Sequence, residues 1–522
     1  MKSSSIFGIC FLSLAGGIGQ VLAQDILLTS DDGAMSISGQ FIEFTDGNYV
    51  IRTTLGDLVM NGDAVNCEGA ACPDLVQVKV EADVVFAGAE TVGNGLLPLL
   101  LEGFSSHISS VIESHETDDG AIFSELIGDD GFGDTVGTFL VNSTGTSDAF
   151  TELANGDTTF GMASRRIFRE EARSLSRAGF GRMTSVEQEH IIAVDNLIVI
   201  VHPSNPVDAI SISDLRRIYE GDITNWSTLG GADQKIAVYN RPTNSGTRSV
   251  FENRIIGTDD HVLVARIVES NETTAARINA NPAALGFVSY AYLNGAKPLQ
   301  LISECNITTS ADSFSAKTEE YPLHRRLYLY TGAEIDTELG REFLEFATSS
   351  FADGVVAKAG YIDLGITRLA QDNSMDRMRN LIANTTDSFE LGLMRELFVE
   401  LFQWDRLSTT FRFASGSNKL ERKSELDLVR LVEYLADQPA GTDVSLVGFT
   451  DSDGAVSANR TLSVRRAEQV REAILQAGQG RLSGINFSAM GFGELSPAAC
   501  NDIGDGKHIN RRVEVWIRDS PA

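Results

Sequence analysis

Residues 241–247 (Arg-Pro-Thr-Asn-Ser-Gly-Thr) bring an arginine, hydroxyl side chains and a glycine to the start of a predicted helix that runs through Phe251. They directly follow a predicted strand at 235–239. Small residues at a helix start leave backbone N–H groups free to face an anion, and the helix dipole favours negative charge there. Arg241 can add a charged fork to such a site. Because Ser and Thr are also ordinary N-caps, plain helix capping is the alternative explanation.

Three further loops have a similar composition. Residues 88–93 follow a predicted strand that begins at Val84, residues 145–150 open another predicted helix, and residues 161–166 end another strand. Several loops of this kind in one domain favour a convergent oxyanion site over repeated capping.

A second set of polar motifs lies near the C-terminal end. Its blocks are residues 448–454, 459–467, 491–494 and 510–514. Predicted strands at 444–448, 487–490 and 513–517 and a predicted helix at 463–477 indicate an α/β sandwich. This order places Asp451 in a loop after a strand and Arg466 on a helix face.

The elements that must position these motifs divide the chain into several parts. Residues 25–75 alternate polar and apolar side chains around a turn at 45–48, which predicts a small β domain. Residues 83–370 alternate strands with amphipathic helices, which is typical of an α/β fold. Residues 371–405 read as a helical connector, or alternatively as the last helices of the middle domain, and residues 406–522 form the C-terminal domain.

Composition and the N-terminus indicate an exported protein. The formal net charge of the 522 residues is -30, which argues against nucleic acid as a partner. Lys2, an apolar run at 6–18 and small or apolar residues at 21–23 are typical of a signal peptide cleaved before Gln24. A membrane anchor is the weaker alternative, because the run is short and broken by glycines. The sequence therefore predicts a mature protein of the periplasm.

The cysteines fit an oxidising compartment. Cys67 and Cys72 are close enough in sequence to form a local disulfide. Cys305 and Cys500 are either buried and free or paired. The seven histidines are scattered along the chain, so the sequence predicts no metal site and no cofactor.

The C-terminal blocks together resemble the peptidoglycan-binding domain of the OmpA family. The resemblance implies that Asp451 accepts hydrogen bonds from the ammonium group of meso-diaminopimelate while Arg466 holds its carboxylate, with Asn459 and Thr450 supporting the pocket. A carboxylate and a guanidinium match the two charges of an amino acid. The alternative is that Asp451 and Arg466 form only a surface salt bridge.

The middle domain resembles the periplasmic phosphate-binding proteins of ABC transporters. The resemblance rests on residues 193–197, 219–226, 241–247 and 320–330, and it covers about residues 84–364. It implies two α/β lobes that close over one tetrahedral oxyanion, with chain crossings near 193–201 and 286–292. By this resemblance the ligand contacts are, in lobe one, Thr91, Val92, Ser147, Ser164 and Arg165, and in lobe two, Arg241, Ser245, Gly246 and Thr247.

Two positions depart from that family. Arg165 and Thr243 stand where aspartates are common. An aspartate facing the ligand would accept a proton from phosphate and repel sulfate, so its replacement by Arg165 puts discrimination between these anions in doubt. The alternative is that Arg165 pairs with an acidic residue such as Glu90.

We therefore expect a wall-tethered protein that binds phosphate or a related oxyanion, with peptidoglycan as a second partner. The resemblance raises an ABC transporter permease as a further partner. The alternative is a structural peptidoglycan-associated protein whose middle domain has lost its ligand or contacts another protein. The sequence predicts no enzyme, because it shows no Ser-His-Asp motif and no signature of phosphate hydrolysis.

Overall fold

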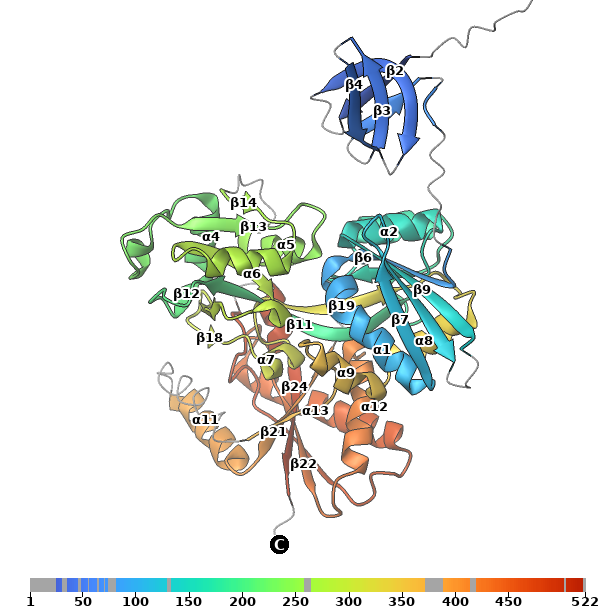
Figure 1. Cartoon of the computed structure of the whole chain (residues 1–522). Coiled ribbons are helices and arrows are strands. Elements are labelled where there is room, and N and C mark those ends of the chain that lie inside the picture. Colours follow the sequence, from blue (N-terminus) through green and yellow to red (C-terminus); the bar gives the residue numbers. More distant parts are fainter. Residues whose placement is uncertain are drawn as a thin grey trace, which may run out of the picture. The chain divides into compact units, whose positions relative to one another are not determined.

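The structure is a computed structural model of the chain, shown in Figure 1. It describes residues 25–30, 35–45, 48–54, 56–62, 65–69, 71–73, 81–128, 133–257, 264–370, 388–413, 419–501 and 504–519. The predicted signal peptide and residues 371–387 of the predicted connector lie outside the described residues. The chain divides into two compact units, Met1–Val80 and Glu81–Ala522, and we describe each by itself.

The N-terminal unit is an antiparallel five-stranded sheet with the order β4-β3-β2-β1-β5. The two alternating runs of the sequence form β2 and β3, which pair as a hairpin. Ile26, Leu28 and Ile51 are fully buried in its small core. A disulfide joins Cys67 to Cys72, with the two Cα atoms 5.9 Å apart. The strands are β1 (Asp25–Ser30), β2 (Ser36–Thr45), β3 (Asn48–Thr53), β4 (Gly56–Asn61) and β5 (Val65–Glu68).

The middle of the chain forms two α/β lobes that share one sheet, with the path β14-β13-β15-β11-β19-β10-β6-β9-β8-β7. Lobe one contains β6 (Val84–Ala89), η2 (Thr91–Leu96), α1 (Leu97–His107), β7 (Ser110–Glu116), β8 (Ile122–Gly128), β9 (Thr135–Thr144), α2 (Thr146–Asn155), β10 (Phe160–Ala163), α3 (Arg169–Arg177), α8 (Glu338–Thr348), η6 (Ser350–Ala352) and α9 (Asp353–Lys358). Lobe two contains β12 (Ala209–Ser211), α4 (Ile212–Glu220), η3 (Trp226–Leu229), β13 (Ala237–Asn240), α5 (Gly246–Phe251), η4 (Glu252–Ile256), β14 (Arg266–Ile267), α6 (Asn271–Asn279), β15 (Ala284–Ser289), η5 (Tyr290–Tyr292), β16 (Lys297–Pro298), β17 (Gln300–Ile302), β18 (Thr308–Thr309) and α7 (Ser313–Lys317).

Two long strands carry the chain between the lobes (Figure 1). β11 (Glu189–Val201) pairs with β19 (His324–Tyr330) along its first half and with β15 along its second half. Its side chains accordingly enter the core of lobe one at Ala193 and the core of lobe two at Leu197. The first crossing is therefore close to the predicted position.

The second crossing was predicted near 286–292, and this prediction was wrong. β15 stays in lobe two, where Phe287 belongs to the same core as Leu323. The chain returns to lobe one at the start of β19, because Leu327 is packed in the core of lobe one. Residues 290–292 only reach the boundary between the lobes, where the Tyr290 N–H donates to Asp195 (3.0 Å). The strand 284–289 is apolar enough to pass for a crossing, so its sequence did not reveal the difference.

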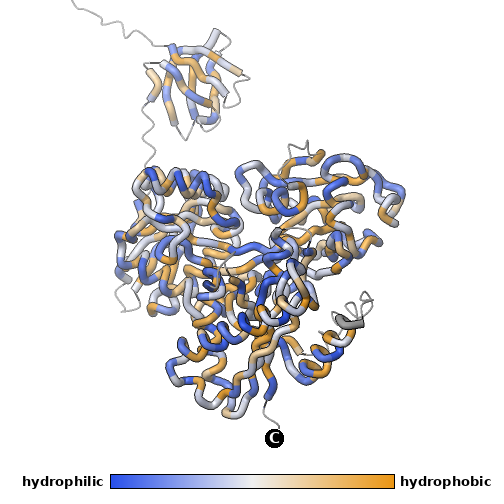
Figure 2. The backbone as a smooth tube through the Cα atoms, turned by 180° about the vertical axis from the view of Figure 1, so that it is seen from behind, coloured by the Kyte–Doolittle hydropathy of each residue, from blue (hydrophilic) through white to orange (hydrophobic). Residues whose placement is uncertain are grey.

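Hydropathy follows this architecture. Figure 2 shows hydrophobic segments running through the strands inside each lobe, with hydrophilic segments towards the outside. Lobe one packs stacked and edge-to-face phenylalanines around Phe86 and Phe343, and lobe two packs Phe251 against Phe287 with ring centroids 4.0 Å apart. Burial of such rings is the main favourable contribution to the stability of each lobe.

The C-terminal domain is a five-stranded sheet with the order β20-β21-β24-β22-β23. Helices α12 and α13 cover one face, where Leu446 and Val515 are buried. The other face buries Val447 and Trp516 against α11. The elements are β20 (Arg368–Leu369), α11 (Ser388–Leu401), β21 (Asp405–Arg412), α12 (Arg422–Ala436), β22 (Asp443–Gly448), α13 (Val456–Gly478), β23 (Asn486–Gly491), α14 (Gly504–Asn510) and β24 (Arg512–Arg518).

These contacts correct two expectations about the connector. α11 packs on the C-terminal sheet, so it is neither a free connector nor the last helix of the middle domain. β20 pairs with β21, although residues 368–369 were assigned to the middle domain. The position of α11 was ambiguous in sequence because an amphipathic helix does not show which neighbour covers its apolar side.

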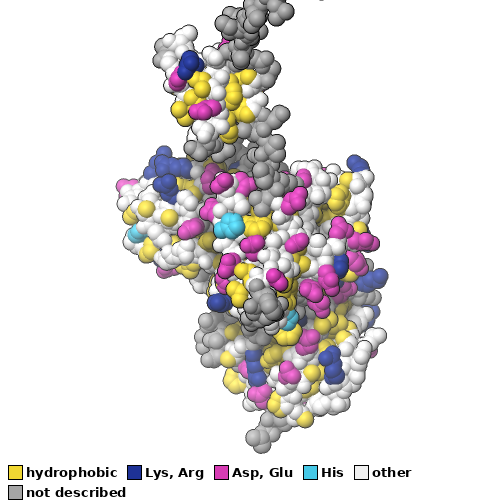
Figure 3. Space-filling model, turned by 45° about the vertical axis from the view of Figure 1, so that its right-hand side comes forward, with side chains coloured by type: hydrophobic (Ala, Val, Ile, Leu, Met, Phe, Trp, Pro, Cys, Tyr) yellow, Lys and Arg dark blue, Asp and Glu magenta, His cyan; other side chains and the backbone are white. Residues whose placement is uncertain are grey.

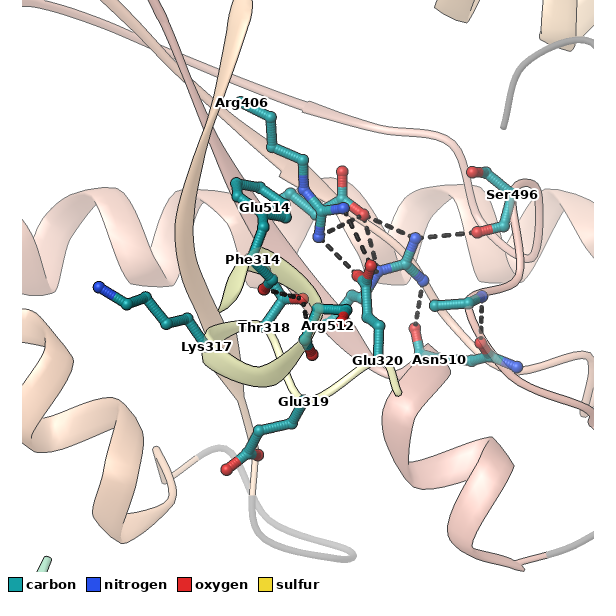
Figure 4. Close-up of polar contacts among 12 residues, drawn as sticks. Phe314, Lys317, Thr318, Glu319, Glu320, Arg406, Ser496, Asn510, Arg512 and Glu514 are labelled. Atoms are coloured by element: carbon teal, nitrogen blue, oxygen red, sulfur yellow. Dashed lines mark hydrogen bonds and ion pairs between the residues drawn. The ribbon is translucent and has the colours of Figure 1, made fainter. Parts of the chain in front are cut away.

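The C-terminal domain is docked against the segment between α7 and β19 through buried ion pairs (Figure 4). Arg406 pairs with Glu320 (2.6 Å) and with Glu514 (3.2 Å), while Arg412 pairs with Glu319 (3.0 Å). Burial opposes ionisation of Glu319, but the surrounding cations dominate and hold its pKa well below the usual range. Removing one member of such a network leaves an uncompensated buried charge, so the network fixes the two domains together.

Covalent and polar links extend this docking to both lobes. A disulfide between Cys305 and Cys500 joins lobe two to the C-terminal domain and settles the pairing that the sequence left open. On lobe one, Arg430 of α12 pairs with Asp353 (2.6 Å). The C-terminal domain therefore holds both lobes at once.

The exposed surface reflects the acidic composition. On the face in Figure 3, acidic side chains are spread widely and basic side chains form only small groups. In the part of the chain that the structure describes, we find no helix with the length and apolar character needed to cross a membrane.

Candidate functional site

A cavity of about 320 Å³ lies where the two lobes meet, and most of the predicted oxyanion contacts converge on it. Thr91 stands where η2 begins, Ser164 follows β10, and the loop after β13 leads into α5. The predicted residues that line the cavity are Thr91, Ser164, Arg241, Ser245, Gly246 and Thr247.

Arg241 is the central cation of this cavity. Its side chain is buried, and its Nη2 donates to Glu90 Oε2 (2.9 Å) and to the carbonyl of Glu269 (2.7 Å). Its Nε and Nη1 have no hydrogen-bond partner among the described residues. Unsatisfied N–H groups on a buried guanidinium cost several kcal/mol, roughly, unless something accepts from them. Arg241 is therefore suited to hold an anion.

The two lobes touch directly across the cavity. A side chain at Gly246 would place its Cβ 2.3 Å from Thr146 Oγ1 and 2.4 Å from Ser164 Oγ, so only glycine permits this approach. Asn244 of lobe two donates to Asp148 of lobe one (3.1 Å). The lobes are thus closed on each other, with the hydroxyl groups at the contact.

Hydroxyl groups and helix starts surround the position in front of Arg241. Thr146 is the first residue of α2 and its Oγ1 lies 3.2 Å from Ser164 Oγ. Ser245 caps α5 by accepting from the Arg248 N–H (3.4 Å), so the capping alternative is realised alongside the cavity position. Behind Thr247, Arg325 donates to its hydroxyl (2.8 Å) and pairs with Asp195 (2.7 Å).

Three predicted contacts of lobe one lie elsewhere. The side chain of Val92 is packed in the core of lobe one. Arg165 forms two hydrogen bonds with Glu171 (2.7 and 2.8 Å) and lies over the ring of Phe168, 3.8 Å from its centroid. Ser147 accepts a hydrogen bond from Arg165 instead of lining the cavity.

The position of Arg165 corrects the expectation that it adds charge to the oxyanion site. The alternative, that Arg165 pairs with an acidic residue such as Glu90, was correct about an acidic partner. The partner is Glu171, whereas Glu90 pairs with Arg241. Glu171 is in the first turn of α3, only six residues from Arg165, and this spacing was the available signal.

Several residues of the cavity were missed in the sequence. Carboxylates from Glu90, Asp148 and the loop at Glu269 line it together with Thr146 and Asn244. Glu90 and Thr146 directly precede the predicted Thr91 and Ser147, so the loops were predicted correctly but not every residue that lines the cavity. The cavity therefore contains acidic groups, which the departure at Arg165 had suggested were lost.

The C-terminal site gathers the predicted wall-binding residues around the end of β22. Asp451 Oδ2 pairs with Arg511 Nη1 (2.7 Å), and Asn459 donates to Glu494 (2.6 Å) and to the Asp451 carbonyl (3.4 Å). The Thr450 N–H donates to the Gly493 carbonyl (2.7 Å). Arg511 was not predicted, although it lies in one of the four sequence blocks.

Arg466 extends from α13 beside this group. Its Nη1 is buried without a hydrogen-bond partner among the described residues, and its guanidinium lies 5.4 Å from the ring centroid of Phe413. Burial lowers the pKa of Arg466 and Arg511 lowers it further, whereas Asp451 opposes both effects. An arginine with an unused buried N–H beside a paired aspartate can donate to an additional carboxylate.

Two α/β lobes joined by crossing strands, with a polar cavity between them, define the class of two-lobed solute-binding proteins. The model of the PBP superfamily domain matches residues 82–350, and the OmpA family model matches residues 412–511. The chain therefore belongs to the PBP superfamily, with a domain like that of phosphate-binding proteins in its middle and an OmpA family domain at its C-terminal end.

Two relatives match the two domains separately. The phosphate-binding protein PstS of Bacillus subtilis is 30% identical over 233 residues, which are 44% of this chain and 73% of that protein. Outer membrane porin F of Pseudomonas aeruginosa is 33% identical over 112 residues, which are 22% of this chain and 31% of the porin. A solved phosphate ABC transporter substrate-binding protein from Clostridium perfringens is 24% identical with a TM-score of 0.42, over 54% of this chain and 98% of the other.

Proposed function

We propose that this protein is an exported binding protein that captures phosphate between its two lobes and is tethered to the cell wall by its C-terminal domain. The observation that carries the first part is Arg241, a buried cation with two unused donor nitrogens in a cavity lined by hydroxyl groups. The name of the relative from Bacillus subtilis supports phosphate as the ligand.

The carboxylates of the cavity favour a protonated oxyanion. At neutral pH hydrogen phosphate carries a proton that Glu90 or Asp148 can accept, whereas sulfate has no proton to donate. A carboxylate facing sulfate would add an uncompensated repulsion in a site shielded from water. The presence of Arg165 in place of an aspartate suggested that the protein had lost a carboxylate that distinguishes phosphate from sulfate. In this proposal Glu90 and Asp148 supply that carboxylate.

Thermal unfolding with added anions tests this proposal. The protein without residues 1–23, stripped of ligand, is heated with phosphate, sulfate or chloride. A ligand at a hundred times its dissociation constant stabilises the folded state by about 2.7 kcal/mol, which raises the midpoint by a few degrees. We expect the increase with phosphate and a much smaller one with sulfate. Equal increases would point to a general oxyanion site and contradict the proposed selectivity.

A structural wall protein is the second candidate, and one observation favours it. Glu90 already takes one nitrogen of Arg241, and the C-terminal domain holds both lobes together. A cavity sealed in this way could serve as a fixed spacer. No increase in the midpoint with any anion would favour this candidate.

We infer that the C-terminal domain binds the peptide stem of peptidoglycan through diaminopimelate. In this proposal the carboxylate of the ligand occupies the unused donor of Arg466, and its ammonium group replaces Arg511 at Asp451. The OmpA family match supports wall binding. The protein would then reside in the periplasm at the wall and outer membrane after removal of residues 1–23, and an ABC transporter permease is a further proposed partner.

A further inference from the structure

A second and larger cavity lies on the other side of the loops that form the oxyanion pocket. It has a volume of about 710 Å³ and shares no lining residue with that pocket. Residues after β10 and along β19 contribute one wall, α5 and η4 of lobe two another, and α12 and α14 of the C-terminal domain close it. The cavity therefore exists only where all three bodies of this unit meet.

The lining of this cavity is strongly basic. Eight arginines face it against three carboxylates, in a chain whose acidic residues far outnumber its basic ones. The innermost arginines are neutralised by buried carboxylates. Arg325 pairs with Asp195, and Arg326 and Arg412 share Glu319. These pairs form the walls of the cavity and are not its binding groups.

The arginines of the rim keep unused donors. Arg166 binds Glu189 through Nε and Nη2, which leaves Nη1, and half of its side chain is exposed. Among the described residues, the side chain of Arg254 contacts an acceptor only through Nη1, which lies 3.1 Å from Asp505 Oδ2. Arg182 is exposed, and its side chain has no ion-pair or hydrogen-bond partner in the described part of the chain. Arg422 donates from Nη2 to the Val186 carbonyl and has a buried Nε without a partner among the described residues.

The positive charge of the cavity also affects the pKa of His324, a histidine of its lining. Burial lowers the pKa of His324 to about 3, Glu319 opposes this shift, and Arg254 and Arg412 reinforce it. His324 therefore stays neutral at physiological pH and adds no charge. Arginines therefore outnumber the other charged groups that line the cavity.

We propose that this cavity binds a linear chain of phosphate groups through Arg166, Arg182, Arg254 and Arg422. Guanidinium forks match phosphate oxygens in geometry and charge, and unlike lysine they stay weakly hydrated. Four rim arginines around 710 Å³ exceed what a single oxyanion can use. A phosphate chain carries a charge on every unit, so several closely grouped cations can contact it together. The chain can be linked by anhydride bonds, as in polyphosphate, or by diester bonds, as in a glycerol phosphate polymer.

Calorimetric titration of the protein without residues 1–23 tests this proposal. Sodium tripolyphosphate is added at physiological ionic strength, with EDTA present and orthophosphate already in excess so that the oxyanion pocket is filled. We expect binding that the excess orthophosphate does not prevent. Arg182→Gln combined with Arg254→Gln should weaken it at least about tenfold, since two charge-assisted contacts are lost. Both residues are partly exposed, so the variant is expected to fold.

The matched control removes the same charge elsewhere. Arg173→Gln combined with Arg277→Gln takes one exposed arginine from each lobe outside the cavity and should leave the titration unchanged. Equal weakening in the control would mean unspecific attraction and would overturn the proposal. Absence of tripolyphosphate binding together with absence of binding by a glycerol phosphate oligomer would overturn it as well.

Further arms identify the ligand and separate the two sites. Binding of tripolyphosphate supports an anhydride-linked chain, and binding of the glycerol phosphate oligomer alone supports a diester-linked one. Equally tight binding of citrate would contradict the assignment to phosphate chains. Arg241→Gln should weaken orthophosphate binding at least about tenfold and leave tripolyphosphate binding intact. If the protein binds tripolyphosphate but never orthophosphate, the proposed function fails while this inference stands.

Discussion

Glu90 of lobe one and Arg241 of lobe two form an ion pair across the oxyanion cavity, with Oε2 and Nη2 2.9 Å apart. The pair links the lobes at the point where an anion would bind. It also leaves two nitrogens of Arg241 unused. A bound anion must therefore share Arg241 with Glu90, and this competition makes both side chains testable.

Replacing Arg241 should weaken anion binding strongly. Among the described residues, Arg241 is the only cation that lines the cavity. Arg241→Gln removes it, and loss of a charge-assisted contact of about 1.5–3 kcal/mol weakens binding roughly tenfold to a hundredfold. Calorimetric titration with phosphate measures the change. Arg277→Gln removes an exposed arginine of the same lobe and serves as the control. Unchanged phosphate affinity in Arg241→Gln would rule out this cavity as the site.

Neutralising Glu90 should reduce discrimination between anions. Glu90→Gln keeps the shape of the side chain but removes the charge that repels sulfate. We expect sulfate affinity to rise about tenfold and the preference for phosphate to shrink accordingly, because about 1.4 kcal/mol of repulsion corresponds to a factor of ten. Parallel titrations with the two anions measure this ratio. The control is Glu102→Gln on the exposed side of α1, which should leave the ratio of phosphate to sulfate affinity unchanged. If the ratio also stays constant in Glu90→Gln, groups other than Glu90 determine the selectivity.

The sequence predicted the loops of this cavity better than their side chains. Residues 241–247 could be predicted locally, because a glycine and hydroxyl groups at a helix start leave backbone N–H groups free to face an anion. Whether Arg165 or Glu90 faces inward depends on their partners. Glu171 is only six residues from Arg165, but Arg241 is in the other lobe, so no local pattern reveals the partner of Glu90. The pairing of Cys305 with Cys500 depends on how two domains dock, and the sequence left it open. The same holds for α11, which the sequence assigned to a connector or to the middle domain and which packs on the C-terminal sheet.

Asp451 should be required for retention on the cell wall. Asp451→Asn removes the negative charge that is expected to hold the ammonium group of diaminopimelate, and the fraction bound to purified peptidoglycan should fall at least about tenfold. Sedimentation with insoluble peptidoglycan measures this fraction. Asp453→Asn changes a neighbouring, more exposed carboxylate that pairs with Lys507, and it should sediment like the unaltered protein. If both variants are retained equally well, the assignment of Asp451 fails.

Histidine burial should make the protein less stable in mild acid. The pKa of His324 is lowered to about 3 by burial, from 6.5 in the unfolded chain. Between these values the unfolded chain binds the extra proton, so the free energy of unfolding falls as pH decreases, by about 1.4 kcal/mol per pH unit for this group. Denaturant unfolding from pH 7 to pH 4 measures the slope.

His324→Asn should flatten this slope while retaining a donor for the Tyr321 carbonyl, which accepts from Nδ1 at 2.8 Å. The slope that remains includes a contribution from His190, whose pKa is lowered to about 4, mainly by burial. His115→Asn changes an exposed histidine and is the control. A slope that does not change in His324→Asn would show that other groups cause the acid sensitivity.

The disulfide between Cys305 and Cys500 should restrain the motion of the lobes. The C-terminal domain is linked to lobe two by this bond and to lobe one by the pair of Arg430 with Asp353, so opening of the lobes must disturb one of the two links. Cys305→Ser combined with Cys500→Ser should therefore speed phosphate dissociation. Because the bond spans 195 residues, its loss should also lower stability by about 2–5 kcal/mol.

Stopped-flow displacement of bound phosphate and thermal unfolding together separate these effects. Cys67→Ser combined with Cys72→Ser removes a disulfide that spans only five residues in the N-terminal unit, and it should leave the dissociation rate unaltered. Lower stability with an unchanged rate in the Cys305 and Cys500 variant would mean that the bond ties the domains together without limiting lobe opening. A faster rate would place the C-terminal domain among the determinants of ligand release, because docking to both lobes then sets how readily the cavity opens.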